Sequence, residues 1–366
     1  MKLREVQLRP FRLTLRTPLQ RAGSGHLDRN GVLLTLIADE SSVGYGEATP
    51  LVEFGTEDIA ATKSLLNDLV RKLVQHPLPS TGEEVEGLLA GLPELAEAPA
   101  ARCGLESALL DLAAQRAGLP LSRFLSGSAR PSIPVSALLS ASEPEDLARE
   151  ALASIREGFR VMKVKVAARI LSDDAKRLIA VRRAVGDEVK IRIDANGAWT
   201  ESEAATALRG LSPLKLELCE QPVPAANHAA LRRLRWQVRC PIAADESVSL
   251  PGAKDFLLDG EDGPVADVVV LKPMVLGGLL PSLRLARRAD ALGVGYYVTS
   301  SLDGVVARLG AAHLAAAVPK ADWASGLAVG QLFEQDTGPD PCPPRGGEIR
   351  LPVQPGLGLS ANWSRA

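Results

Sequence analysis

The sequence predicts an α/β protein built on a (β/α)8-type barrel that a separate α+β domain caps. Three observations carry this prediction. Short apolar segments alternate with amphipathic ones across the middle of the chain, as in repeated βα units that form a parallel sheet. The length of 366 residues exceeds that of one ordinary compact domain. Charged residues recur once per unit, near the ends of the expected strands.

The first part of the chain has a different pattern of apolar and polar residues from the middle. Alternating segments over residues 6–15 and 31–38 predict strands of a small antiparallel sheet, and a helical period begins near residue 56. We therefore expect residues 1–125 to form the α+β capping domain. The following cluster of Gly, Ser and Pro, residues 127–131, is typical of a linker.

Residues 131–330 hold the βα repeats. Strands are expected at residues 133–139, 161–166, 189–194, 216–220, 242–245, 268–272 and 296–300, with a weaker eighth near 321–324. Eight strands in about 200 residues lie near the lower size limit of such a barrel. A doubly wound sheet is the alternative, although no G-x-G-x-x-G follows the first strand to favour it. The Pro-rich segment 331–366 is expected to return to the capping domain and complete it.

Composition and charge narrow the range of partners and compartments. The formal net charge is −2, without a long run of one sign, so neither nucleic acid nor an anionic membrane is an expected partner. No apolar run approaches the roughly 20 residues that span a bilayer, and the N-terminus lacks an apolar signal core. We therefore expect a cytoplasmic protein. Its four widely spaced cysteines are expected to be reduced, with two disulfides as the alternative.

Six charged residues fall on the expected barrel strands. Lys163 and Lys165 share one face of the second strand, because side chains alternate along a strand. The other four end the next four strands at intervals of roughly 25–30 residues, about one βα unit: Asp194, Glu220, Asp245 and Lys272. In a barrel, active sites lie at this edge. Any one of these could be an ordinary charge at a strand end, so the prediction rests on the set.

The combination of buried lysines and clustered carboxylates indicates a kind of chemistry. Burying a lysine is costly unless it is paired, and three carboxylates repel each other unless a cation lies between them. Carboxylates suit Mg²⁺ or Mn²⁺, and a cation held in this way can accept the oxygens of a substrate carboxylate. A lysine beside other cations loses its proton more easily. The expected reaction is removal of a proton α to the carboxylate of a small molecule, followed by reprotonation or loss of a leaving group.

The motifs around these residues resemble those of a known family. K-x-K at 163–165, D-A-N-G-A-W at 194–199, C-E-Q-P at 219–222, A-D-E-S at 244–247 and L-K-P at 271–273 are similar to the muconate-lactonising subgroup of the enolase superfamily. The resemblance implies Mg²⁺ as cofactor, with Mn²⁺ as the alternative. It also implies a role for each residue: Asp194, Glu220 and Asp245 as metal ligands, Lys165 as base, Lys272 across the substrate, Lys163 in support, and Asn196 and Glu246 behind them.

Several loop segments resemble one group of enzymes within that subgroup, the o-succinylbenzoate synthases. These segments are residues 21–25, 46–51, 299–303 and 325–330, with Asp303 where that pattern has Glu and Ser325 where it has Cys. The implied activity is a metal-dependent syn dehydration of a succinyl-hydroxycyclohexadiene carboxylate in menaquinone biosynthesis. It would proceed by lysine-mediated α-proton abstraction and a metal-stabilised enediolate. The implied substrate-binding residues are Gly23, Ser24, Ser300, Ser301, Gly326 and Leu327.

Other activities of the superfamily stay open. An N-succinyl amino acid racemase uses the same lysines in both directions. A dipeptide epimerase is expected to carry D-x-D at the eighth strand, where Asp322-Trp323-Ala324 supplies one acid only. A muconate-type cycloisomerase and a non-catalytic enolase-like scaffold are further alternatives. Assembly into a homo-oligomer is left open, because no pattern in the sequence indicates an interface.

Overall fold

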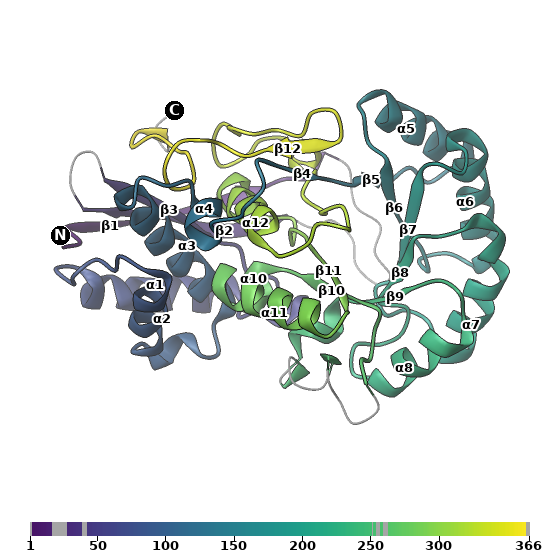
Figure 1. The fold of residues 1–366 in the computed structure, drawn as a ribbon, viewed down its shortest axis with the longest axis horizontal. Helices are drawn as coiled ribbons and strands as arrows, with labels where there is room; N and C mark the ends of the chain where they lie inside the picture. The colour runs from purple at the N-terminus through teal and green to yellow at the C-terminus, as the bar shows by residue number, and fades with distance from the viewer. Residues whose placement is uncertain are drawn as a thin grey trace.

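The computed structural model describes residues 2–16, 28–38, 42–250, 252–253, 257–258 and 263–363. Figure 1 shows two parts lying side by side, an α+β part that holds the N-terminus and a barrel that follows it in sequence. The fold class expected from the sequence, an α/β barrel with an α+β capping domain, is confirmed.

The capping part combines an antiparallel sheet, in the order β1-β2-β3, with helices packed on it. Its elements are β1 (Glu5–Leu13), β2 (Arg29–Ile37), β3 (Val43–Ala48), α1 (Ile59–Leu73), α2 (Gly82–Ala90), α3 (Pro99–Arg116) and α4 (Leu121–Leu125). Glycine lets α3 lie directly on β3, because a Cβ on Gly46 would come within 1.9 Å of the Gly104 carbonyl oxygen. The close backbone approach needs residues without side chains at both positions.

The barrel strands are parallel and follow one another in sequence order around the sheet, from β5 to β11. Its strands are β5 (Ala137–Leu139), β6 (Val161–Lys165), β7 (Lys190–Asp194), β8 (Leu218–Glu220), β9 (Ile242–Ala244), β10 (Val268–Leu271) and β11 (Gly295–Val298). The helices are α5 (Pro144–Arg156), α6 (Leu171–Val185), α7 (Glu201–Gly210), α8 (His228–Gln237), α10 (Pro273–Leu276), α11 (Leu279–Ala291) and α12 (Val305–Ala317). In Figure 1, helices α5 to α8 form the outer layer over strands β6 to β9.

The eighth position of the barrel is filled by a short connection. Ser325 and Gly326 form isolated parallel bridges with Val135 and Thr299, respectively, and so join the two edges of the sheet. The pairing falls just after residues 321–324, where the sequence suggested a strand. Trp323 packs against the interior of the barrel at that point and takes no part in a ladder.

The C-terminal segment passes the start of the barrel and reaches the capping part, as the yellow ribbon in Figure 1 shows. Strand β12 (Glu348–Arg350) pairs antiparallel with β4 (Ser132–Pro134). Further on, Leu357 donates its N–H to Asp111 of α3 at 2.7 Å, and Trp363 packs edge-on against Tyr45 of β3 with ring centroids 5.5 Å apart. The boundaries at 125, 131 and 330 stay predictions.

Two buried glutamates of the capping part bind the first turns of barrel helices. Glu47 of β3 accepts hydrogen bonds from Gly304 N–H at 2.6 Å and Ala307 N–H at 3.3 Å, where α12 begins. Glu106 of α3 accepts one from Leu280 N–H at 3.1 Å, where α11 begins. The free N–H groups and the dipole of a helix N-terminus favour a negative charge there. Both glutamates therefore join the two parts of the molecule.

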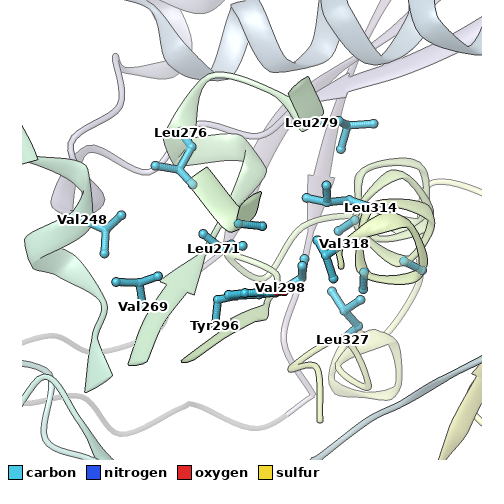
Figure 2. Close-up of a cluster of buried hydrophobic side chains, with 14 of the residues drawn as sticks. Val248, Val269, Leu271, Leu276, Leu279, Tyr296, Val298, Leu314, Val318 and Leu327 are labelled. Atoms are coloured by element: carbon cyan, nitrogen blue, oxygen red, sulfur yellow. The ribbon is translucent and has the colours of Figure 1, made fainter. Parts of the chain in front are cut away.

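Side chains alternate between two apolar layers along β10 and β11. Figure 2 shows Val269, Leu271, Tyr296 and Val298 in the outer layer, packed among side chains of the covering helices and of nearby loops. Their sequence neighbours belong to a separate interior cluster: Leu218, Ala243, Val268, Val270 and Tyr297. Fully burying one such large side chain stabilises the fold by about 1.5–3 kcal/mol.

Within the described ranges, no helix is both long and apolar enough to cross a membrane. The four cysteines are free thiols, as the sequence predicted, and Cys103 and Cys219 are buried.

Candidate active site

The register of the parallel sheet brings the predicted charged residues together at one end of the barrel. Lys165 of β6 is paired with Asp194 of β7, which is paired in turn with Glu220 of β8. Asp245 and Lys272 directly follow β9 and β10. A cavity at this end is lined by polar and charged side chains and closed over by apolar ones: Lys163, Lys165, Asp194, Asn196, Asp245, Lys272, Ser136, Thr299, Ser300, Ser301, Gly326, Leu51, Phe54, Leu138, Leu302 and Val329.

Lys163 occupies the centre of the carboxylate group. Its Nζ lies 2.9 Å from Oδ2 of Asp194 and 2.6 Å from Oε1 of Glu220, and both carboxylates are buried. Burial lowers the pKa of Lys163, but the charges of the three carboxylates outweigh it and raise the pKa above its ordinary value. Lys163 is therefore a permanent cation in this structure and not a candidate base.

The pKa values of the two carboxylates that share Lys163 shift in opposite directions. Burial raises the pKa of Asp194, but Lys163 and Lys165 outweigh burial and lower it to about 2. For Glu220, burial and the charges of Asp194 and Asp245 raise the pKa to about 7, although Lys163 acts against them.

Lys165 lies on the opposite side of the cavity from Lys272 in the strand order, with β7 to β9 between them. Its Nζ donates to Oδ1 of Asn196 at 3.2 Å, and Nδ2 of Asn196 donates to Oε1 of Glu246 at 3.0 Å. The structure therefore brings together the two supporting residues implied by the resemblance, and it places both behind Lys165.

Lys272 is held by a charge and by an aromatic ring. Its Nζ donates to Oδ2 of Asp245 at 2.5 Å and lies 3.8 Å from the centroid of the Phe54 ring, which the capping part contributes. A carboxylate and the face of an aromatic ring each stabilise an ammonium cation. The Lys272 side chain is therefore set up to present positive charge to the cavity.

Hydroxyl groups line the cavity beyond β11. Asp303 accepts at Oδ2 from the hydroxyl of Ser300, at 3.1 Å, and from the backbone N–H of Ser301, at 2.9 Å, so it holds the turn in place. The hydroxyl of Ser301 is buried and has no hydrogen-bond partner among the described residues. A buried hydroxyl without a partner is costly, unless a bound molecule completes it.

Of the other predicted substrate-binding residues, one lines the cavity, one does not, and two lie outside the described residues. Gly326 lines the cavity with Ser300 and Ser301. Leu327 does not, because alternation turns its side chain into the outer apolar layer, where Figure 2 shows it. Gly23 and Ser24 lie outside the described residues.

Three residues that contribute to the site were not predicted from the sequence. Phe54 lies in a short turn more than 200 residues from Lys272 in sequence, and no local pattern links them. Gln221 accepts a hydrogen bond at Oε1 from Asp245 N–H at 3.0 Å and so fixes the end of β9. Its position next to Glu220 in the sequence could have indicated a role at the site. Tyr297 donates to Glu220 at 2.5 Å, and the inward phase of its strand could have indicated this.

The lower layer of the barrel interior, which we call the floor, consists of Arg192, Tyr297 and Trp323. The guanidinium carbon of Arg192 lies 4.6 Å from the Tyr297 ring centroid and 5.8 Å from that of Trp323. Arg192 also donates to Oε2 of Glu217 at 2.5 Å and to the Ala324 carbonyl at 2.7 Å. Arg192 and Tyr297 are almost wholly buried, so the floor is a packed layer below the carboxylates.

The donor chemistry of this site fits a divalent cation. In the part of the chain that the structure describes, no three acidic, histidine or cysteine side chains are arranged as a metal-binding group. The three carboxylates instead contact lysine ammonium groups. Three buried carboxylates on adjacent strands nevertheless supply the oxygen ligands that Mg²⁺ takes in proteins. Asp194 and Glu220 lie in register on neighbouring strands, so their oxygens are close enough together for such an ion to offset their charge.

A parallel barrel with lysines and carboxylates at its C-terminal edge, covered by an α+β domain, defines the class of two-domain enolase-type enzymes. Family models of this class match both the capping part and the barrel of this chain. Residues 3–126 match the model of the mandelate racemase / muconate lactonizing enzyme N-terminal domain, and residues 146–365 match the enolase C-terminal domain-like model. The chain belongs to the mandelate racemase and muconate lactonizing enzyme family of the enolase superfamily.

Individual relatives in this family carry the names of different reactions. The chain is 29% identical to an N-succinyl-L-Arg/Lys racemase of Bacillus cereus over 99% of its own length and 96% of the relative's. It is 40% identical to an o-succinylbenzoate synthase of Thermobifida fusca, over 54% of its own length and 60% of the relative's. A dipeptide epimerase of Enterococcus faecalis, complexed with Mg and the dipeptide L-Leu-L-Tyr, superposes with a TM-score of 0.89 at 26% identity, covering 98% and 100% of the two chains.

Proposed function

We propose that this protein is an o-succinylbenzoate synthase, a lyase of menaquinone biosynthesis. It would remove water from a succinyl-hydroxycyclohexadiene carboxylate and leave an aromatic product. The 40% identity to a synthase of that name, although limited to about half of each chain, supports this assignment.

One observation favours dehydration over a reaction with two bases. Lys272 is clasped between the Asp245 carboxylate and the Phe54 ring, which both stabilise its ammonium form. A lysine held as a cation can stabilise negative charge on the substrate but is poorly suited to take a proton. Dehydration needs one base only, so the arrangement suits it.

Lys165 would carry the proton transfers. As the free amine it takes the proton α to the substrate carboxylate, and as the resulting ammonium it gives that proton to the departing hydroxyl group. The proton and the hydroxyl leave together as water, from the same face of the ring. Asn196, which accepts a hydrogen bond from Lys165 Nζ at 3.2 Å, would orient the amine during both steps.

Asp194, Glu220 and Asp245 would hold Mg²⁺, with Mn²⁺ as the alternative. When bound, the ion supplies positive charge to the oxygens of the substrate carboxylate, which makes the α-proton more acidic. Lys163 lies between two of these carboxylates and would keep them in place beside the cation. The relative with Mg in its structure supports this choice of metal.

The wall beyond β11 suits a succinyl chain better than an ammonium group. Hydroxyls of Thr299, Ser300 and Ser301 line it, and the free hydroxyl of Ser301 could donate to a carboxylate or carbonyl oxygen. At the eighth position Ser325 and Gly326 bring no acid toward the cavity. A dipeptide, which carries an α-ammonium, would lack a carboxylate partner there.

N-succinyl amino acid racemisation is the second candidate. It is favoured by the placement of Lys165 and Lys272, which line the same cavity from strands on either side of β7 to β9. Two lysines so placed could exchange a proton on opposite faces of one carbon, provided that Lys272 gave up its proton.

A pair of assays separates the candidates. Purified protein with Mg²⁺ is given the cyclohexadiene substrate, whose dehydration is followed by ultraviolet absorbance, and separately an N-succinyl amino acid, followed by polarimetry. We expect dehydration to be the faster reaction by a wide margin. Racemisation without dehydration would overturn the proposed function, and inactivity in both assays would reject the two candidates together.

A further inference from the structure

Tyr297 stands out because it places a hydroxyl group beneath the carboxylates. Figure 2 shows its neighbours in sequence, Tyr296 and Val298, in the outer apolar layer among the helices. Side chains alternate along a strand, so Tyr297 points the other way, into the barrel. It belongs to the interior cluster with Leu218 and Val270 and does not line the cavity above.

The hydroxyl of Tyr297 contacts one particular oxygen of the site. It donates to Oε2 of Glu220 at 2.5 Å, and Lys163 Nζ lies 2.7 Å from the same oxygen. Glu220 is wholly buried and Tyr297 nearly so, which excludes water from the contact. A tyrosine hydroxyl can donate one hydrogen bond, and here it donates to this buried oxygen.

The floor holds the tyrosine ring itself in position. Arg192 lies over the ring at 4.6 Å and is fixed in turn by Glu217 and by the Ala324 carbonyl. The attraction between an arginine and an aromatic face is stronger where water is excluded, as it is here. The ring therefore has little freedom to carry its hydroxyl away from Glu220.

We propose that Tyr297 is a positioning residue, which orients the Glu220 carboxylate from below so that it binds a divalent cation. The inference rests on the proposed function, because it takes Glu220 as a metal ligand. Lys163 contacts both oxygens of this carboxylate, whereas Tyr297 contacts Oε2 only. The tyrosine therefore fixes the rotation of the carboxylate and leaves Oε1 as the oxygen available to the cation. Partners that hold metal ligands in this way change metal affinity by about 10–100-fold when they are removed.

The test measures metal binding directly and needs no substrate. Magnesium chloride is titrated by calorimetry into the metal-free full-length protein, into Tyr297→Phe, and into Tyr296→Phe as matched control. The first substitution keeps an aromatic ring over Arg192 and removes only the hydroxyl. The control likewise loses one hydroxyl, that of Tyr296, which accepts a hydrogen bond from Lys320 N–H at 2.9 Å away from the site.

We expect Mg²⁺ to bind Tyr297→Phe about tenfold more weakly than the wild type, and to bind Tyr296→Phe unchanged. Thermal unfolding followed by circular dichroism shows that each variant is folded at the titration temperature. Equal Mg²⁺ affinity in Tyr297→Phe and wild type would overturn the inference and leave the proposed function standing. A wild type that binds no Mg²⁺ would reject the proposed metal chemistry, and the inference with it.

Discussion

Buried carboxylates occur in two regions of this molecule, and the two regions stabilise them differently. At the junction between the capping part and the barrel, Glu47 faces backbone N–H groups at the start of α12. Glu106 faces one at the start of α11 and also lies 3.3 Å from the Arg102 guanidinium. In the cavity, Asp194 shares a full ammonium charge, that of Lys163. Burial raises the pKa of both junction glutamates to about 7, whereas the lysines lower the pKa of Asp194 to about 2.

Glu47 and Asp194 together show what a full counter-charge adds to partial ones. Amide dipoles at a helix start offset part of the cost of burying a carboxylate, and an ammonium group offsets more. Glu220, in register with Asp194 on the next strand, is the informative exception, because burial and its two carboxylate neighbours outweigh Lys163 and Lys272 and raise its pKa to about 7. Stability should thus respond to neutral pH at the junction and at Glu220, and the site around Glu220 should in addition respond to cations.

The largest expected effect tests the chemistry of the cavity. Replacing Lys165 by alanine removes the proposed base, and a general base contributes about 10²–10⁴-fold to a rate. We expect kcat for dehydration to fall by about 10³-fold, which corresponds to about 4 kcal/mol in the activation barrier. Lys176→Ala, at an exposed lysine of α6, is the matched control and should keep wild-type kcat. Turnover by Lys165→Ala at the control rate would refute the assignment of the base.

The next effect tests the junction through its pH dependence. Glu47 is protonated in the folded and unfolded states below pH 4.5, so its burial is least costly there. As the pH rises from 4.5 to about 7, Glu47 ionises in the unfolded chain but stays protonated in the folded state, so stability is lost until the pH passes the folded-state pKa. Between pH 4.5 and 8 we expect this one group to lower the free energy of unfolding by about 3 kcal/mol.

Urea unfolding of wild type and Glu47→Gln across that pH range checks this. The difference between the two free energies isolates Glu47, because all other groups are shared. The variant should lose less stability than wild type as the pH rises, and Glu348→Gln, at an exposed position of β12, should follow wild type. Parallel curves for wild type and Glu47→Gln would mean that the junction carboxylate does not change its protonation on folding.

The smallest expected effect concerns the aromatic partner of Lys272. Phe54→Leu keeps an apolar side chain over the cavity but removes the ring face that stabilises the ammonium group. A contact of this kind contributes about 1 kcal/mol, so we expect kcat for dehydration to fall by about fivefold. Val52→Ala, at an exposed position of the same turn, should leave kcat unchanged. An unchanged kcat in Phe54→Leu would show that Asp245 alone holds the charge of Lys272.

The sequence predicted those parts of the site that follow from strand periodicity. Asp194, Glu220 and Asp245 recur at the ends of expected strands, and the β6–β7–β8 register places Lys165, Asp194 and Glu220 in one row. The barrel and its capping domain followed from the same alternation of elements. Such features are local, because a strand end and the phase of its side chains can be read from a few neighbouring residues.

Features that depend on distant segments could not be predicted in this way. Phe54 reaches Lys272 only because the capping part lies over the barrel, and its own segment shows no sign of that contact. The eighth strand was expected slightly too early, since Trp323 is turned into the floor. Leu327 was predicted to bind substrate. Gly326 faces the cavity, however, so alternation along the chain directs the side chain of Leu327 outward.

The floor also determines how molecules travel through this protein. Arg192, Tyr297 and Trp323 fill the barrel below the carboxylates, so the described chain leaves little passage from that end. Substrate, water and product must then cross the opposite mouth, where Leu51 and Phe54 of the capping part form the rim. Exchange of substrate and product with solvent therefore takes place at the contact between the capping part and the barrel, so product release depends on both domains.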